Sequence, residues 1–297
     1  MLVNTNGLSN LFTGFKGNFQ GGFGKATPMW NQVATLITSA TETELYAFLG
    51  QFPQMKEWAG DRLIKNMKAH KYTLTNKPYE ATIEVPRPKI EDDTFGIFAP
   101  IVEEMGYSAA MHPDELVFAA LAAGASSDCY DGQYFFDTDH PIIVNDAVTT
   151  ASNYDSSGGG ALWCLLDTKR PLKPLIYQER QKSQFKSFNT MDSEHVFRRN
   201  TFLYGVDDRC AAGYGLWQLA YGSLNTLNST NVQTYVAAMM ALKSDEGKPL
   251  NIIPDLCVVG PSRWATARDL FMVPTLSGGA ANPNFGLCKV LVSPYLT

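Results

Sequence analysis

Four histidines and five cysteines are the residues of this 297-residue chain whose types most readily do chemistry. Nucleophilic catalysis needs a Ser or Cys within hydrogen-bond reach of a base. None of His70, His112, His140 and His195 has an obvious nucleophile beside it in the sequence, although residues far apart in the chain could still meet in the fold. We therefore interpret the chain as a protein that is not an enzyme and assign no catalytic residue.

One turn resembles part of a metal site. Asp137, Asp139 and His140 lie within four residues and are followed by Pro141. Two carboxylates and one imidazole are an incomplete ligand set for zinc or calcium, whereas Asp and Pro are common turn residues. We therefore predict a turn here, with no metal and no cofactor.

Two glycine motifs suggest nucleotide loops but lack required parts. Residues 24–27 read Gly-Lys-Ala-Thr, but Phe19 and Ala26 stand where a phosphate-binding loop needs Gly and Ser or Thr. Gly213 and Gly215 lack the third glycine of a dinucleotide fingerprint. Neither motif predicts a bound nucleotide.

Composition excludes several classes of protein. The net charge of −5 argues against a dedicated nucleic-acid binder, which would be basic, but it allows a container for nucleic acid. No apolar run approaches the ~20 residues of a membrane span, and no signal peptide is expected. Unpaired cysteines favour buried thiols in a reducing compartment, most clearly Cys164 and Cys257 within apolar stretches; the others are Cys129, Cys210 and Cys288.

The first 25 residues combine many glycines with regularly spaced phenylalanines. Glycine at this density opposes regular structure in isolation, whereas phenylalanine at this density opposes a fully solvated tail. The segment is either a disordered tail or an arm that becomes ordered on a neighbouring subunit, and we favour the arm. Its candidate contacts between subunits are Phe12, Phe15, Phe19 and Phe23.

A second candidate surface is basic. Residues 30–40 look extended, and helices are predicted over 42–49 and 55–70. Arg62, Lys65 and Lys68 fall near one stripe of the second helix. The stripe is either a solvated face or an interface for an acidic neighbour.

An alternating strand follows at residues 79–85. Apolar side chains face one way and polar ones the other, and prolines on both sides favour an edge strand or an outlying hairpin. Glu80 and Glu84 lie on its polar face, outside the expected core, where we expect them to meet a basic partner on another subunit.

A helical pattern begins near Phe95. Pro100 either kinks this helix or marks where it begins, and Pro113 is expected to start a second helix that ends at Gly124. Residues 145–160 read as a loop. Strands are predicted at 161–166, 175–178, 184–188 and 195–206; an α/β unit of helix, strand, helix and strand follows at 231–243, 255–259, 261–272 and 287–292.

Residues 80–124 resemble the extended loop, spine helix and first peripheral helix of tailed-phage capsid proteins and encapsulins. Further motifs narrow the resemblance to the major head (capsid) protein of Mu-like phages and prophages, the gpT family. They are FDTDHP at 136–141, LLDTKRPLKPLI at 165–176, YGVDDR at 204–209, GYGLWQLAYGS at 213–223, GKPL at 247–250 and VSPYL at 292–296.

The resemblance implies an α+β fold, the tailed-phage major capsid fold of Hong Kong 97 type (Johnson fold). Its expected parts are an N-terminal arm at 1–40, an extended loop at 71–91, a spine helix at 92–110, a peripheral domain at 111–141 and 201–223, and an axial domain at 142–200 and 224–297. The α/β unit comes later here than in the usual capsid order, so we expect a permuted connection.

The resemblance also implies a function. Pentamers and hexamers of the chain would form an icosahedral shell around double-stranded phage DNA, without sequence-specific binding. A scaffold protein and a portal are the expected partners, no membrane is involved, and the protein would pass from the host cytoplasm into the virion. The alternative is the shell protein of an encapsulin-like bacterial nanocompartment.

Overall fold

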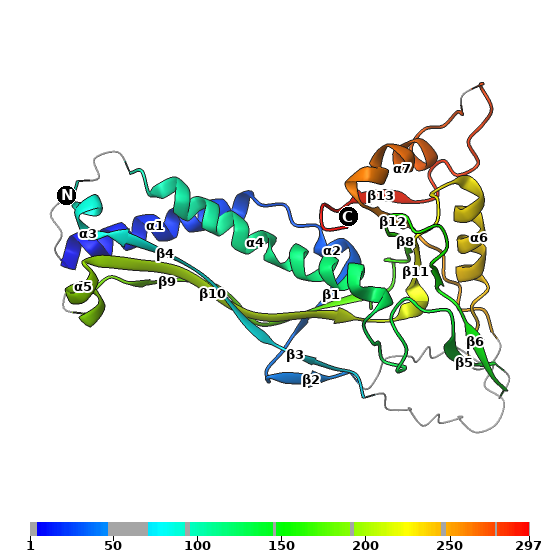
Figure 1. The fold of residues 1–297 in the computed structure, drawn as a ribbon, viewed down its shortest axis with the longest axis horizontal. Helices are drawn as coiled ribbons and strands as arrows, with labels where there is room; N and C mark the ends of the chain where they lie inside the picture. The colour runs from blue at the N-terminus through cyan, green and yellow to red at the C-terminus, as the bar shows by residue number, and fades with distance from the viewer. Residues whose placement is uncertain are drawn as a thin grey trace, which may run out of the picture.

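The computed structural model describes residues 5–46, 71–92, 96–144, 147–190, 193–244, 248–276 and 278–296. Figure 1 shows a long lobe, which carries the N-terminus at its far end, joined to a compact lobe that contains the C-terminus. The fold is α+β, as predicted.

A four-stranded sheet runs through the long lobe. Strands β9 (Leu175–Phe188) and β10 (Thr201–Tyr214) pair antiparallel, β4 (Lys77–Pro86) pairs antiparallel with β10, and β1 (Ala34–Thr38) runs parallel to β9. The order is β1-β9-β10-β4, so β4 is an edge strand, as its prolines predicted. At ~3.3 Å per residue, the 14 residues of β10 span roughly 45 Å, which accounts for the elongated shape.

Two helices lie along this sheet (Figure 1). They are α1 (Thr5–Lys25) and α4 (Ala99–Ala122), and they pack against each other as well. Between the helices and the sheet lies a small apolar core. Its buried members are Leu8, Phe15, Phe19, Val85, Ile90, Val102, Met105, Val196, Phe202, Tyr204 and Val206.

Glycines allow α1 and α4 to approach closely. A Cβ on Gly22 would lie 1.8 Å from the backbone oxygen of Glu103, and a Cβ on Gly106 would lie 2.1 Å from that of Phe19. Any larger side chain at either position would separate the two helices.

Helix α4 runs without interruption through Pro113, so the prediction of a second helix starting there is wrong. Pro100 lies in the first turn, which confirms that it marks where the helix begins. The carboxylate of the buried Asp114 accepts hydrogen bonds from the backbone N–H groups of Met29 and Trp30, and so ties α4 to the start of the short helix α2 (Trp30–Val33).

The compact lobe is built on a five-stranded sheet of order β13-β12-β8-β11-β7. Every residue of its three inner strands is buried. Its strands are β7 (Tyr154–Asp155), β8 (Trp163–Leu166), β11 (Ala220–Ser223), β12 (Leu256–Val259) and β13 (Lys289–Val292), and its helices are α6 (Ser229–Met240) and α7 (Trp264–Phe271).

Short elements complete the fold. Two antiparallel pairs are β2 (Thr43–Leu45) with β3 (Thr73–Thr75), and β5 (His140–Val144) with β6 (Ala147–Ala151). Helices α3 (Arg87–Glu91) and α5 (Glu194–Arg199) lie at the far end of the long lobe (Figure 1). Among the described residues, 3-10 turns occur at Ala123–Ala125, Trp217–Leu219 and Pro261–Arg263.

The first 25 residues were expected to be a disordered tail or an arm ordered on a neighbouring subunit, but their described part is a helix packed on α4 and the sheet of its own chain. Residues 5–25 form a 21-residue helix because the apolar residues recur every three or four positions and bury one helix face. Burial of that face outweighs the low helix propensity of glycine.

The extended loop predicted at 71–91 is not a hairpin of its own. Within it, β3 pairs with β2, whereas β4 pairs with β10 along ten residues. Val85 is buried in the core of the long lobe, so β4 belongs to the core of its own subunit. Sequence alternation identified the strand but not its partner.

Other local predictions also needed correction. The helix expected at 42–49 is strand β2 where the structure describes it, and residues 30–33 are helical rather than extended. The loop expected at 145–160 contains β6 and β7, and the helix α5 interrupts the strand expected at 195–206. The helix expected at 55–70 lies outside the described residues.

The predicted division into domains does not follow the pairing of strands. Strands β9 and β10 were expected in different domains but pair along most of their length. Strand β11 was expected in the peripheral part, yet it pairs with β7 and β8 in the compact lobe. A chain that crosses between the lobes along β9 and β10 has no single boundary at residue 200 or 223.

Candidate assembly surfaces

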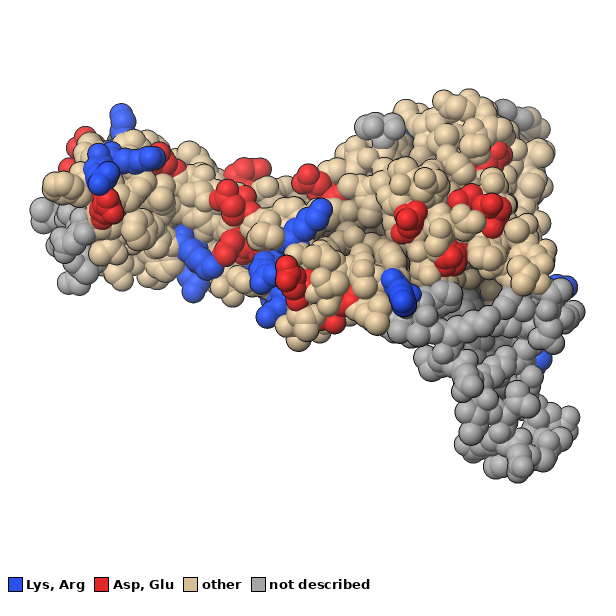
Figure 2. Space-filling model, turned by 60° about the horizontal axis from the view of Figure 1, so that its bottom comes forward, with Lys and Arg blue, Asp and Glu red and all other residues tan. Residues whose placement is uncertain are grey.

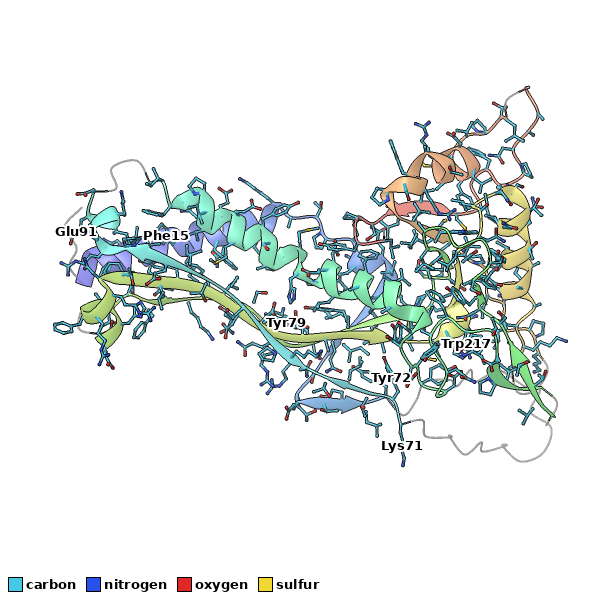
Figure 3. All side chains as sticks on the ribbon, viewed as in Figure 1. Phe15, Lys71, Tyr72, Tyr79, Glu91 and Trp217 are labelled. Carbon is cyan, nitrogen blue, oxygen red and sulfur yellow. The ribbon has the colours of Figure 1, made fainter. Side chains whose placement is uncertain are left out.

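The four phenylalanines of α1 fall into two groups. Phe15 and Phe19 are buried within their own chain, where Phe15 packs edge-on against Tyr204 and Phe19 stacks on Phe185. Phe12 also stacks on Phe185. Only Phe23 among the four has a strongly exposed side chain, at 44%. Figure 3 shows Phe15 near the middle of α1 in the long lobe.

The two glutamates of β4 are exposed but have different surroundings. Glu80 accepts a hydrogen bond from Thr82 on the same strand. Glu84 accepts a hydrogen bond from Thr201 on β10, and its carboxylate lies 3.6 Å from Nε2 of His195. The expectation that these carboxylates lack partners in their own chain is therefore wrong for Glu84. The basic stripe of Arg62, Lys65 and Lys68 lies outside the described residues.

A groove of about 590 Å³ lies between α4 and the strands β4 and β10. We call it the lobe groove, and Figure 3 shows Tyr79, one of its lining residues, about midway along the long lobe. Its apolar lining includes Ile83, Ile101, Met105, Leu116 and Val206, and its acidic side chains are Glu104, Glu115 and Asp208. Glu80 and Asp207 also border it, but strand alternation turns their side chains to the other face of the sheet.

His112 lies in this groove and joins a group of polar side chains. Its Nδ1 is 3.2 Å from the Asp208 carboxylate, to which Ser183 and Cys210 also donate. The ring of Tyr79 packs edge-on against the imidazole at 4.4 Å. Burial, as the largest cause, raises the pKa of Cys210 to about 12, so the thiol stays protonated and is a poor metal ligand.

The compact lobe contains a second group around His140. Nδ1 of His140 lies 2.8 Å from the Asp131 carboxylate, and Nε2 lies 3.2 Å from Oδ1 of Asn153. The amide nitrogen of Asn153 donates to the carbonyls of Phe135 and Trp217, which fixes its oxygen toward the imidazole. Both ring nitrogens of His140 therefore face oxygen atoms, so the imidazole is held in place from two sides.

The surroundings of His140 favour an ionised Asp131. Burial alone would raise the pKa of Asp131, but hydrogen bonds from His140 and Cys129 outweigh it and leave that pKa lowered. The imidazole stacks on Trp217 with ring centres 3.9 Å apart. Figure 3 shows Trp217 within the compact lobe.

Cys129, Asp131 and His140 have metal-binding side chains close together, yet hydrogen bonds already join them. Burial raises the pKa of the Cys129 thiol, whereas zinc binds the thiolate. We call Cys129, Asp131, His140 and Asn153 the polar clamp, because their hydrogen bonds join β5, residues 129–137 and the turn at Trp217. Sequence reasoning selected His140 but missed Asp131 and Cys129, because nothing in their spacing distinguishes them from other turn residues.

The other residues of the candidate metal turn serve the backbone. The carboxylate of Asp137 accepts hydrogen bonds from the N–H groups of Tyr134 and Thr138, as an aspartate in a turn does. Asp139 is exposed, and its hydrogen bond with Asp137 raises its pKa. Neither carboxylate joins Asp131 and His140 in the polar clamp.

Among the helices that the structure describes, none combines the length and the apolar character that crossing a membrane would require.

Comparison with known proteins covers almost the whole chain. The model of the Mu-like prophage major head subunit gpT family matches residues 8–296. The chain is 38% identical to the major capsid protein of Escherichia phage Mu, over all of both chains. It is 42% identical to the Mu-like prophage FluMu major head subunit of Haemophilus influenzae, over 88% of this chain and 87% of that one.

Solved structures show the same likeness. A chain from the procapsid of bacteriophage JBD30 matches with a TM-score of 0.88 and 46% identity, over 99% of this chain and all of that one. A chain from the JBD30 capsid matches with a TM-score of 0.80 and 33% identity over the whole of both. The fold is the tailed-phage major capsid fold, and the chain belongs to the gpT family of Mu-like prophage major head subunits.

Proposed function

We propose that copies of this major head subunit assemble into an icosahedral shell that encloses double-stranded phage DNA. The observation that carries the proposal is the whole-chain match to the subunits of a phage procapsid and capsid. The same matches favour a phage head over an encapsulin-like compartment. The family's role is structural, and the mechanism is mechanical: many weak contacts act together in a closed lattice.

The shape of the subunit supports this mechanism. The long lobe has only a thin core between two helices and one sheet, and it leaves large apolar side chains in solvent, including Ile97, Ile101 and Phe197. Exposed apolar surface of this kind is typical of contacts between proteins. We assign the long lobe to the peripheral domain and spine, and the compact lobe to the axial domain.

Particular contacts between subunits follow from the exposed residues. Phe23 is the phenylalanine of α1 with most surface to offer a neighbour, and Glu80 presents an exposed carboxylate. The basic residues Arg62, Lys65 and Lys68 have the opposite charge and are one candidate partner for Glu80. An exposed ion pair contributes at most ~1 kcal/mol, but a shell repeats it many times.

Membership of the family suggests further partners. A scaffold protein and a portal would direct assembly in the host cytoplasm, and the finished shell would form the capsid of the virion. A shell subunit of net charge −5 fits non-specific enclosure of DNA rather than sequence-specific binding.

The test is assembly of the purified protein. We expect light scattering and sedimentation to detect particles above a threshold concentration, and electron microscopy to show closed shells. Addition of the scaffold protein from the same genome should lower the threshold. A protein that stays monomeric at every concentration, with and without the scaffold, would contradict the proposal.

A further inference from the structure

Helix α5 presents one phenylalanine to solvent. Phe197 is 89% exposed, while its neighbour Val196 is buried in the core of the long lobe. The Ser193 side chain accepts a hydrogen bond from the Val196 N–H at the start of α5, and Asn200 ends the helix with a φ of 54°. Caps at both ends hold the turn in place, so the exposure of Phe197 belongs to an ordered element.

The surroundings of Phe197 are basic and aromatic. Arg198 and Arg199 follow it on α5, and both are exposed. Arg198 forms an ion pair with Glu194 one turn earlier, at 2.9 Å, and Phe188 is 49% exposed at the end of β9. Figure 2 shows Lys and Arg side chains at the far end of the long lobe, with Asp and Glu side chains beside them. Aromatic and Arg side chains are enriched at the centres of protein interfaces.

The lobe groove has the complementary chemistry. Ile83, Ile101 and Met105 give it an apolar wall, and Ile101 is half exposed. Three acidic side chains line the groove, Glu104, Glu115 and Asp208, with no Lys or Arg among the described residues that line it. Glu104 and Glu115 are exposed on α4.

The two surfaces cannot meet within one chain. Helix α5 lies at the far end of the long lobe, whereas Tyr79 and the groove lie about midway along it (Figures 1 and 3). A contact between them therefore needs a second copy. Because it joins two different patches of the subunit, it is heterologous, and repeated heterologous contacts build rings and lattices.

We propose that α5 of one copy docks in the lobe groove of another, with Phe197 against Ile101 and Ile83 and the two arginines facing the carboxylates of the groove. This inference rests on the proposed function, because it describes one of the contacts by which copies of the subunit assemble.

A cross-link tests the contact directly. The five native cysteines are all buried, so engineered thiols would dominate the reaction. In assembled particles of the Phe197→Cys, Ile101→Cys double variant, oxidised glutathione should produce a ladder of linked subunits. The two single variants serve as controls and should produce no ladder beyond dimers. Particles of the double variant that yield no ladder would overturn the docking.

Assembly of surface variants supplies a second test. Phe197→Ser should raise the threshold concentration about tenfold, since it removes one buried aromatic side chain from each contact. Phe285→Ser removes an exposed phenylalanine of the compact lobe and should leave the threshold unchanged. A subunit melting curve that matches wild type shows that Phe197→Ser acts on assembly alone.

Charge reversal completes the design. Arg198→Glu with Arg199→Glu should impair assembly, and Glu104→Arg with Glu115→Arg should restore it. Suppose that wild-type protein forms shells, that the α5 variants (Arg198→Glu with Arg199→Glu) form them equally well, and that the groove variants (Glu104→Arg with Glu115→Arg) do not. The groove then receives another segment, and the proposed docking is wrong. If wild-type protein forms no shells, the proposed function itself fails.

Discussion

Gly106 of α4 lies against the backbone of Phe19 in α1, so closely that a Cβ on Gly106 would be 2.1 Å from the Phe19 carbonyl oxygen. Gly22 of α1 meets Glu103 of α4 in the same way. The docking of the N-terminal helix thus depends on two glycines, while the phenylalanines beside them supply the apolar burial.

Alanine substitutions in α1 separate packing from helix propensity. Gly22→Ala should destabilise the subunit by about 1–3 kcal/mol, because the new methyl group meets the backbone of Glu103. Gly21→Ala is the matched control, since a Cβ on Gly21 meets nothing within 4 Å. It should stabilise the helix by about 0.5–1 kcal/mol. Denaturant unfolding of both variants is the measurement, and equal effects would mean that α1 does not pack as described.

The N-terminal helix also shows where sequence reasoning succeeds and where it stops. The spacing of Phe15 and Phe19 is a visible helical period, but the density of glycine outweighed it in the interpretation. Only the structure shows that Gly22 and Gly106 meet another helix. When helical spacing and glycine content predict different structures, contacts with distant segments decide which structure forms.

Strand β4 shows the same limit of prediction from sequence. Alternation and flanking prolines predicted β4 and its edge position correctly, because both features depend on one strand alone. Its pairing with β10 depends on residues more than a hundred positions away. The polar clamp was missed for the same reason: Asp131 and Asn153 reach His140 only in the folded chain.

The Asp131–His140 pair should make stability depend on pH. The pKa of Asp131 is lowered in the folded state, so its stabilising effect is complete well above the ordinary value of 3.8 and is lost as the pH falls through the folded pKa. Asp131→Asn should cost roughly 1.5–3 kcal/mol at pH 7, because it removes the ionised acceptor of the hydrogen bonds from His140, Cys129 and the Gln133 N–H. The difference from wild type should shrink below about pH 4.

Thermal unfolding across this pH range measures the effect. Asp128→Asn, at an exposed position on the same segment, is the control and should behave like wild type. A loss of stability for Asp131→Asn that is the same at every pH would contradict a stabilising role for the ionised carboxylate.

The thiols should react slowly in the native protein. Cys164 and Cys257 are fully buried, and burial raises the pKa of both thiols. The thiols are therefore protonated, and a reagent cannot reach them in the folded protein. Labelling with a thiol reagent at pH 8 should modify them only on unfolding. The variant Phe197→Cys should add one rapidly reacting thiol and thus report that the reagent is active. Rapid modification of Cys164 and Cys257 in native protein would mean that the inner strands of the compact lobe are not buried.

The two glutamates of β4 separate assembly from folding. Glu80 hydrogen-bonds only within its own strand among the described residues, whereas Glu84 accepts from Thr201 and lies near His195. Glu80→Lys should therefore leave subunit melting nearly unchanged but raise the concentration needed for assembly, because a basic partner on the neighbouring copy now meets a like charge. Glu84→Lys should also lower the melting temperature, since it removes a cross-strand hydrogen bond and places a cation beside His195.

High salt should weaken wild-type assembly in the same direction as Glu80→Lys, because it screens exposed pairs. Melting of dilute subunits and light scattering of concentrated ones measure the two effects. If Glu80→Lys melts as early as Glu84→Lys, or assembles at the wild-type threshold, Glu80 does not serve a contact between subunits.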